Sequence, residues 1–546
     1  MPSEFKRGAI RLLSNYARLG LFLALGILFV PIFMLGTGDA GLGLLGLLGS
    51  GIGIAEMCNE IARQSMNREL GAAYHSDEKD EFRETFNAAI VLTAGLALIT
   101  ALLFVILALC LPLFRIPDEL RPAAMWLLVC KGIYSVISVL FGPQFNMYLV
   151  TERMVLYNTW SVLKRASEFA AALILFVLLG LRDPELGIKA FAVLSAGGMI
   201  LTHMTAVTLI TMKDRRLIPQ PSCIRMSRIR SVLSTAGWNS ASVTAMNMHI
   251  RLDNLIMNSF GIIYNTGFTL ATRLAGYIRV IAFSSTQGLD VVSARLEKEG
   301  GGQRVEAMMQ HSTRIHAMVA LPAGAVVLFL ADPLMTLWVG RMTENPETLA
   351  TAIVLAQVLV IGMTARGISD CWTRTLYGAG HIRAYAPLVL FGGVLNPLIA
   401  IGLIAVLPPD EKYLGPAIAF SSIFVVLHFL IIPFIAARCL NVGVKRILAP
   451  VFRPAVTTLF ASAILLLPHT EPGRGSIIVL LVSIALFVVA LLPLSWFWVL
   501  PPADRHQIRQ VILRRLKRAP GRAPGDAGVS EDSLDESFPP EQKAAR

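Results

Sequence analysis

Residues 234–279 read STAGWNSASVTAMNMHIRLDNLIMNSFGIIYNTGFTLATRLAGYIR, and this stretch decides how the rest of the chain is interpreted. It is apolar enough to form two membrane-spanning helices. It also carries four charged side chains, Arg251, Asp253, Arg273 and Arg279. A charge at the centre of a membrane-spanning helix costs about 2.5–3.5 kcal/mol on insertion scales, so such a group faces a protein partner or a watery cavity. The stretch therefore indicates a polar pathway inside a membrane protein.

The polar residues of the first of these helices follow a helical spacing. Asn247, Arg251, Asn254 and Asn258 lie on one face of a 3.6-residue helix, which is typical of a helix that lines a cavity. Arg251 and Asp253 are two residues apart and do not face each other. We expect Asn247, Arg251 and Asn254 to bind substrate and Asp253 to be a candidate coupling acid. The alternative is that neighbouring helices neutralise both charges.

Composition places the whole chain in the membrane. Of its 546 residues, 55% are hydrophobic and only 15% are charged, and the mean hydropathy is +0.64. Apolar runs long enough to span a bilayer recur from end to end. We therefore expect an all-α polytopic membrane protein with about fourteen spans, since each needs about 20 residues.

The net charge of +12 fits the same interpretation. Most lysines and arginines fall in loops on the side of the N-terminus, so the positive-inside rule predicts that both termini are cytoplasmic. The expected location is the cytoplasmic (inner) membrane, with membrane lipids and no nucleic acid as partners.

The spans divide into two lobes. We expect an N-lobe of six spans at 1–212, a basic cytoplasmic linker at 213–230 and a C-lobe of six spans at 231–440. Two extra spans follow at 441–502, and a basic amphipathic segment with a disordered tail occupies 503–546.

A faint internal repeat supports the two lobes. The Gly- and Asp-containing turn at 36–41 matches the Gly- and Asn-containing turn at 261–267. The offset of about 226 residues is what a duplicated lobe would give.

Charged residues also occur in other predicted spans. Lys131 can contact substrate or extend to the membrane surface. Glu56 is a candidate for binding a coupling ion or proton. Asp370 is another coupling candidate, but Arg366 lies one turn away and the two can form an ion pair instead.

Arg273 and Arg279 have no acid on their own span, which favours anion binding by both. The alternative for Arg279 is extension to the membrane interface. His311 and His316 lie near a predicted loop, so we expect both at the surface. The six cysteines are scattered and no hydrolase, nucleotide or metal motif occurs, so we expect no catalytic residue, no metal and no cofactor.

Three segments carry a resemblance to a known family. They are NYARLGLFLALGILFVPIFMLGTGDAGLGLL at 15–45, RELGAAYHSDEKDEFRETFNAAI at 68–90 and LDNLIMNSFGIIYNTGFTLATRLAGYI at 252–278. In order and spacing, the chain resembles the multidrug/oligosaccharidyl-lipid/polysaccharide (MOP) exporter superfamily, and within it the polysaccharide-biosynthesis flippases. The resemblance implies two pseudo-symmetric six-helix lobes around a central cavity, with two extra C-terminal helices. It implies that the two lobes alternate access to the two membrane faces. It also implies that intramembrane cations recognise a lipid diphosphate, and the matching positions are Arg18, Arg251, Arg273, Arg279 and Arg366.

The resemblance predicts a flippase, rather than an enzyme, that translocates a lipid-diphosphate-linked oligosaccharide. Its partners would be this substrate and possible glycan polymerases or glycosyltransferases. One alternative is a cation-coupled multidrug exporter of the same fold, which should have a net acidic cavity. A second is a membrane-embedded polysaccharide polymerase or ligase, which should have a large extracytoplasmic loop.

Overall fold

The computed structural model describes residues 2–74, 76, 79–284, 289–298, 302–469, 477–502, 504–506 and 509–510. Within its helices, the following side chains lie outside the description: 2–13, 56, 58–65, 67–68, 72, 79, 231–244, 246–247, 283–284, 291 and 298.

The described residues form helices joined by short connections, without a strand among them. The first half contains α1 (Pro2–Tyr74), α2 (Lys79–Leu109), η1 (Leu111–Leu113), η2 (Asp118–Leu120), α3 (Arg121–Leu140), α4 (Gly142–Val150), α5 (Met154–Ala172), η3 (Leu173–Leu178) and α6 (Pro184–Lys213). The connection to the second half contains η4 (Arg215–Leu217) and η5 (Pro221–Cys223).

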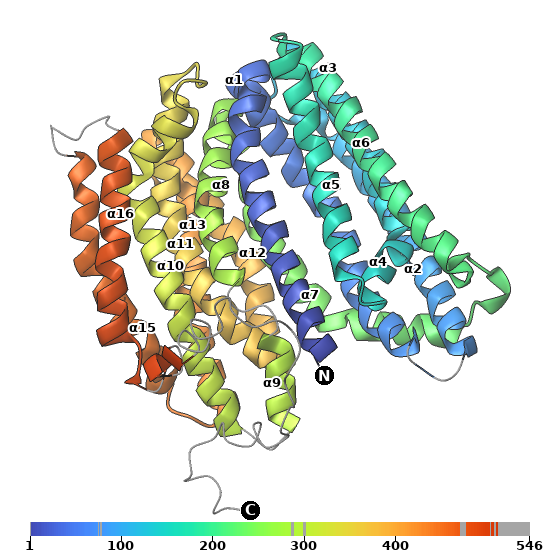
Figure 1. Ribbon diagram of the computed structural model, residues 1–546. Coiled ribbons are helices and arrows are strands. Elements are labelled where there is room, and N and C mark those ends of the chain that lie inside the picture. The colour runs from blue at the N-terminus through green and yellow to red at the C-terminus, as the bar shows by residue number, and fades with distance from the viewer. Residues whose placement is uncertain are drawn as a thin grey trace, which may run out of the picture. The chain divides into compact units, whose positions relative to one another are not determined.

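The second half continues with α7 (Met226–Met257), η6 (Asn258–Phe260), α8 (Ile262–Ser284), α9 (Leu289–Lys298), α10 (Gly302–Val339), α11 (Pro346–Gly378), α12 (Ile382–Val406), η7 (Pro409–Leu414), α13 (Gly415–Ile423), η8 (Phe424–Ile431) and α14 (Ile432–Leu440). The chain then forms α15 (Val444–Ala461), η9 (Ser462–His469), α16 (Ile477–Leu494) and η11 (Ser495–Val499). In Figure 1, α1 lies between α5 and α8, and it contacts both.

Helix α1 consists of two arms that meet at Gly38. This residue has φ 63° and ψ −170°, a backbone conformation that a residue with a side chain rarely adopts. The bend separates the two spans that the sequence predicts at either end of the turn 36–41. A side chain at Gly38 would also lie against the carboxylate of Glu344, because its Cβ would be 3.3 Å from Oε1.

Ten helices of the described chain are long and apolar enough to cross a membrane, and one of them covers both arms of α1. Three further helices are not among the ten. They are α5 together with η3, then α7, and then α8. They carry intramembrane charges such as Glu168, Asp253 and Arg273. With these three helices and the second arm of α1, each of the fourteen predicted spans has a helical counterpart. The prediction of an all-α polytopic membrane fold is confirmed.

Long apolar side chains on the outer surfaces support the same conclusion. Leu109, Leu201, Phe460 and Ile478 are examples of large hydrophobic residues that are at least 70% exposed. A water-soluble protein rarely exposes so much contiguous apolar surface, whereas a lipid-facing helix must. The chain is a multi-pass membrane protein.

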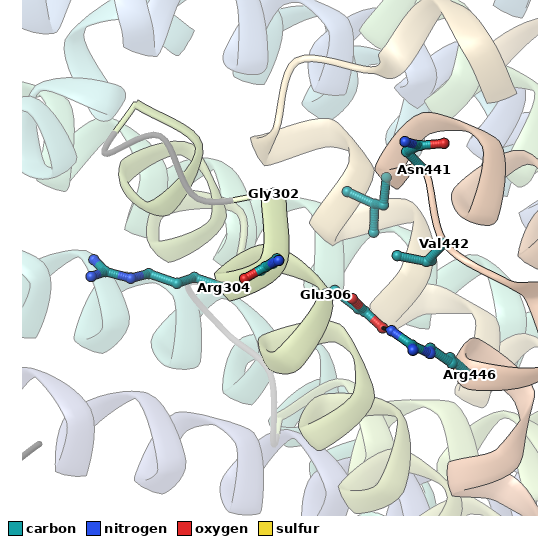
Figure 2. Close-up of a pocket in the computed structure, with 8 residues that line it drawn as sticks. Gly302, Arg304, Glu306, Asn441, Val442 and Arg446 are labelled. Atoms are coloured by element: carbon teal, nitrogen blue, oxygen red, sulfur yellow. Dashed lines mark ion pairs between the residues drawn. The ribbon is translucent and has the colours of Figure 1, made fainter. Parts of the chain in front are cut away.

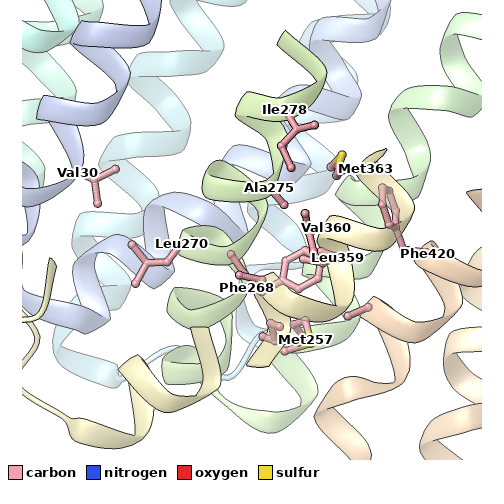
Figure 3. Close-up of a cluster of buried hydrophobic side chains, with 14 of the residues drawn as sticks. Val30, Met257, Phe268, Leu270, Ala275, Ile278, Leu359, Val360, Met363 and Phe420 are labelled. Carbon is pink, nitrogen blue, oxygen red and sulfur yellow. The ribbon is translucent and has the colours of Figure 1, made fainter. Parts of the chain in front are cut away.

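The largest buried cluster joins α8 to α11. On α8, Phe268, Ala275 and Ile278 lie on one face, and Figure 3 shows them beside Leu359 and Met363 of α11. Lipid tails are as apolar as these side chains, so close van der Waals packing, rather than escape from water, holds such helices together. The cluster therefore fixes α8, the second helix of the central stretch, against α11.

The chain separates into two compact units, Met1–Leu492 and Pro493–Arg546. In the first unit, Leu480 and Phe487 of α16 pack with Leu330 of α10 and Leu465 of η9. Most of the second unit, including nearly all of the predicted tail 503–546, lies outside the described residues.

Candidate functional site

The second arm of α1 contacts α7 and α8 through a stripe of small residues. Gly43, Gly46, Ser50 and Gly53 lie on one helical face. A Cβ at Gly43 would be 2.4 Å from the carbonyl oxygen of Ile262, and one at Gly46 would be 1.9 Å from the Thr269 hydroxyl. Only glycine allows the helices to approach so closely. We call this contact of residues 43–53 with α7 and α8 the seam.

A chain of side-chain amides continues the seam. Asn254 Nδ2 donates to Ser50 Oγ at 3.0 Å, and Asn265 Nδ2 donates to Asn254 Oδ1 at 2.9 Å. Asn258 Nδ2 donates to Asn265 Oδ1 at 2.9 Å, and Asn258 Oδ1 accepts from the backbone N–H of Arg115 at 2.7 Å. All three asparagines are buried, so this network specifies how the first half of the chain docks on the second.

Asp39 adds a further link beside the seam. Its carboxylate accepts from the Thr348 hydroxyl at 3.0 Å and from the backbone N–H of Asn345 at 3.1 Å. Its carbonyl accepts from Thr266 Oγ1 at 2.7 Å. Asp39 and Asn265 occupy equivalent positions of the two repeated turns, a signal that could have identified both as structural partners.

Arg251 and Asp253 diverge, as their spacing predicts. Arg251 Nη1 donates to the carbonyl of Gly49 at 3.1 Å, and its guanidinium fills the space that a side chain at Gly53 would need. Asp253 is fully buried on another side of α7, where it accepts from Asn396 Nδ2 of α12 at 2.7 Å. Its second oxygen has no partner among the described residues.

A first charge cluster is centred on Glu168 of α5. Its carboxylate accepts from Lys131 Nζ of α3 at 3.0 Å and is paired with Arg165, one turn earlier on α5. Arg165 and Arg273 both lie on the ring of Phe29, at 5.9 and 5.6 Å from its centroid. The cluster therefore holds three cations and one carboxylate.

The first cluster lies at mid-membrane depth. Lys131 is ten residues into α3, which corresponds to about 15 Å at 1.5 Å per residue. This is about half of a hydrocarbon core of roughly 30 Å. Arg273 lies at a similar distance from the start of α8.

A second charge cluster is centred on Asp370 of α11. Its Oδ2 accepts from Arg279 Nε of α8 at 2.9 Å. Arg366, one turn earlier on α11, is buried with its guanidinium 5.0 Å from the centroid of the Phe424 ring. Arg366 Nε has no hydrogen-bond partner among the described residues. Arg374 interacts electrostatically with the same carboxylate and also with Asp290, so this cluster holds three cations and two acids.

Comparisons with known proteins agree with this architecture. The MatE family matches residues 240–401. A structure titled lipid II flippase MurJ, in an inward closed conformation, has a TM-score of 0.63 at 11% identity, covering 93% of this chain and 100% of that chain. An inward-facing MATE family multidrug resistance transporter of the MOP superfamily has a TM-score of 0.61 at 13% identity, covering 78% of this chain and 95% of that one.

The chain has the fold of the MOP-superfamily transporters. A further MOP transporter, from Pyrococcus furiosus, has a TM-score of 0.56 at 16% identity, covering 80% of this chain and 96% of that chain. That transporter is described as having a binding pocket of reverse polarity. No curated protein matches the sequence. The predicted resemblance to the MOP superfamily is confirmed.

Two predictions about the charges of this MOP fold are wrong. Arg279 is not unpaired, because Asp370 reaches it from α11. His316 is not at the surface: it is buried, and its Nδ1 lies 2.7 Å from the carbonyl of Gly367. The pattern along one helix does not show an acid or a carbonyl that a different helix supplies.

Three further residues were predicted at the site: Arg18, Asn247 and Glu56. Arg18 is half-buried on the first arm of α1 and takes part in no hydrogen bond or ion pair among the residues that the structure describes. The side chains of Asn247 and Glu56 lie outside the described residues. Arg165 and Phe29 were not predicted as site residues, although Arg165 precedes Glu168 by one helical turn.

Proposed function

We propose that this chain is a flippase that translocates a lipid-diphosphate-linked oligosaccharide across the cytoplasmic membrane by alternating access, for polysaccharide biosynthesis or export. The observation that carries the proposal is the excess of positive charge in both intramembrane clusters. The first cluster holds three cations around a single carboxylate, Glu168, and the second holds three cations with two acids, Asp370 and Asp290.

An excess of buried cations needs a counter-charge. A charge removed from water is costly when nothing neutralises it, so a cluster with an excess of positive charge is stabilised when an anion enters it. A lipid diphosphate supplies that anion. Arginine suits this role because its planar guanidinium binds phosphate oxygens in a bidentate manner and stays protonated.

Arg273 and Arg366 are the best candidates for direct contact. Both stack on an aromatic ring, Phe29 or Phe424, which holds the guanidinium without using its N–H donors. Lys131, Arg165 and Arg279, in contrast, are already paired with carboxylates. We therefore assign Arg273 and Arg366 to the substrate.

The charge balance also separates this function from export of cationic drugs. A site for a cation should be net acidic, whereas both clusters are net basic. A cationic substrate would be repelled by Arg273 and Arg366 before it reached Glu168 or Asp370.

The test is flipping by the purified full-length protein in liposomes, with a fluorescent undecaprenyl-diphosphate-linked sugar. Arg273→Gln and Arg366→Gln each remove one cation, and we expect the flipping rate to fall by about 10- to 100-fold, because a charge-assisted hydrogen bond contributes about 1.5–3 kcal/mol. Arg341→Gln is the matched control, since Arg341 is exposed in the α10–α11 connection.

Two results would contradict the proposal. In the first, both variants flip the lipid as fast as the control. In the second, the wild-type protein moves a cationic dye in the same liposomes and leaves the diphosphate lipid in place.

The expected orientation and partners are part of this proposal. Both termini would be cytoplasmic, glycosyltransferases on that side would supply the lipid-linked glycan, and a polymerase on the opposite side would consume it. The basic linker 213–230 would then lie at the cytoplasmic face, as its composition favours.

A further inference from the structure

A polar hollow of about 540 Å³ lies away from both charge clusters, where the start of α10 meets the turn between α14 and α15. Figure 2 shows its lining. The lining residues are Gly302, Gln303, Arg304, Glu306, Leu440, Asn441, Val442 and Arg446. The hollow therefore joins the helices of the predicted C-lobe to the first of the two extra helices.

Among the charged residues that line the hollow, Glu306 and Arg446 lie side by side, whereas the side chain of Arg304 points away from them (Figure 2). Glu306 and Arg446 approach each other, with Arg446 Nη1 at 3.6 Å from Glu306 Oε1 (Figure 2). This separation is longer than a hydrogen bond. Glu306 Oε1 also accepts from Gln310 Nε2 at 2.9 Å. The carboxylate side chain is 10% exposed and the arginine side chain 70% exposed, and both line the hollow.

The apolar surface next to the hollow places it at the edge of a bilayer. Phe434 of α14 and Phe452 of α15 are exposed large aromatic residues. Phe434 lies six residues before the end of α14 at Leu440, and Phe452 lies eight residues after the start of α15 at Val444, which is about 9 and 12 Å along the two helices. Lipid-facing rings at that depth put the turn itself in the headgroup layer, which extends a few ångströms beyond the hydrocarbon on each side.

We propose that this hollow binds a phosphoethanolamine group, the headgroup of phosphatidylethanolamine, with its ammonium on Glu306 and its phosphate on Arg446. The acyl chains would lie along Phe434 and Phe452. This proposal is independent of what the two lobes transport.

The charge pattern selects this zwitterion over other headgroups. A purely anionic headgroup would meet the buried carboxylate of Glu306 and be repelled. A choline headgroup has the right charges, but its quaternary nitrogen has no N–H to donate to that carboxylate. Only an ammonium next to a phosphate matches both Glu306 and Arg446.

The experiment uses the delipidated full-length protein, supplied with phosphatidylethanolamine, phosphatidylcholine and phosphatidylglycerol in equal amounts. Native mass spectrometry measures which lipid is retained. For the wild type, we expect phosphatidylethanolamine to exceed each of the others by about tenfold or more, because hydrogen bonds to charged groups contribute about 1.5–3 kcal/mol. Free phosphoethanolamine in a parallel sample distinguishes a soluble ligand from a lipid.

Three variants assign the contacts. Glu306→Gln keeps the shape and the contact with Gln310, and it should abolish the preference for phosphatidylethanolamine over phosphatidylglycerol. Arg446→Gln should lower retention of all three lipids. Lys445→Gln is the matched control, because Lys445 is an exposed cation one residue away that does not line the hollow. The thermal unfolding temperature of each variant shows that it is folded.

The proposal is overturned if Glu306→Gln retains the wild-type preference, or if Lys445→Gln removes it to the same extent. Tight binding of free phosphoethanolamine without retention of the lipid would overturn the assignment to a lipid.

Discussion

Replacing Gly43 by alanine should loosen the seam between α1 and α8. The added Cβ would lie 2.4 Å from the carbonyl oxygen of Ile262 and 2.5 Å from Thr266 Oγ1, whereas ordinary contact begins at 3.4 Å. Because the first of these atoms belongs to the backbone, no side-chain rotation relieves the clash. The two helices must separate by about 1 Å, and overpacking of this kind typically costs about 1–3 kcal/mol.

Gly49→Ala is the matched control for this change. Gly49 lies on the same arm of α1, and a Cβ there would meet nothing within 4 Å. Both substitutions gain the same helix propensity, about 1 kcal/mol, so this contribution cancels in the comparison. The remaining cost at Gly43 should increase the equilibrium population of the open form of the seam, in which α1 and α8 are separated, by about 5- to 100-fold.

The assay is labelling of a cysteine in the seam. Thr269 is only 6% exposed, and Thr269→Cys in a background without the six native cysteines gives a reporter facing Gly46. We expect a membrane-impermeant maleimide to label it faster in the Gly43→Ala protein than in the Gly49→Ala protein, which should behave like the parent. Equal labelling rates in the two variants would refute the close contact on which this reasoning rests.

Two further predictions concern charged groups. Glu168→Gln leaves Lys131 and Arg165 without their shared carboxylate, so we expect the free energy of unfolding to fall by about 3–5 kcal/mol. Thermal unfolding in detergent measures this loss. An unchanged unfolding midpoint would contradict the pairing. In the linker, the hydrogen bond from the Arg216 side chain lowers the pKa of Asp214. The resulting stabilisation, about 0.2–1 kcal/mol, is present above the unfolded-state pKa and is lost as the pH falls through the folded-state pKa. Hydrogen exchange of residues 214–217 should therefore become less protected at acid pH, and Asp214→Asn should remove that pH dependence.

The sequence predicts the fold well because its signals are local. Span length, helical period and the glycine at a bend are properties of a short segment, and the two arms of α1 on either side of Gly38 follow from them. The polar face of α7 was also predictable, since Arg251, Asn254 and Asn258 share it by spacing alone. Arg251 and Asn254 indeed contact the second arm of α1.

The composition of the charge clusters was less predictable, because it depends on contacts between helices. Arg279 finds its carboxylate 91 residues away on α11, and Lys131 finds its own on α5. Helical periodicity identifies neighbours three or four residues apart and nothing further. For the same reason, the carbonyl of Gly367 that makes His316 a buried residue could not be inferred from the segment around that histidine.

Helix α8 connects the two clusters mechanically. Arg273 and Arg279 are six residues apart, which is about 9 Å along the axis and about 240° around it. Arg273 therefore faces Phe29 of α1, while Arg279 faces Asp370 of α11. Packing of Phe268, Ala275 and Ile278 makes the helix a firm element between them. A tilt of α8 that brings Arg273 closer to an anion must also move Arg279 relative to Asp370. Neutralising either cluster therefore changes the forces on both.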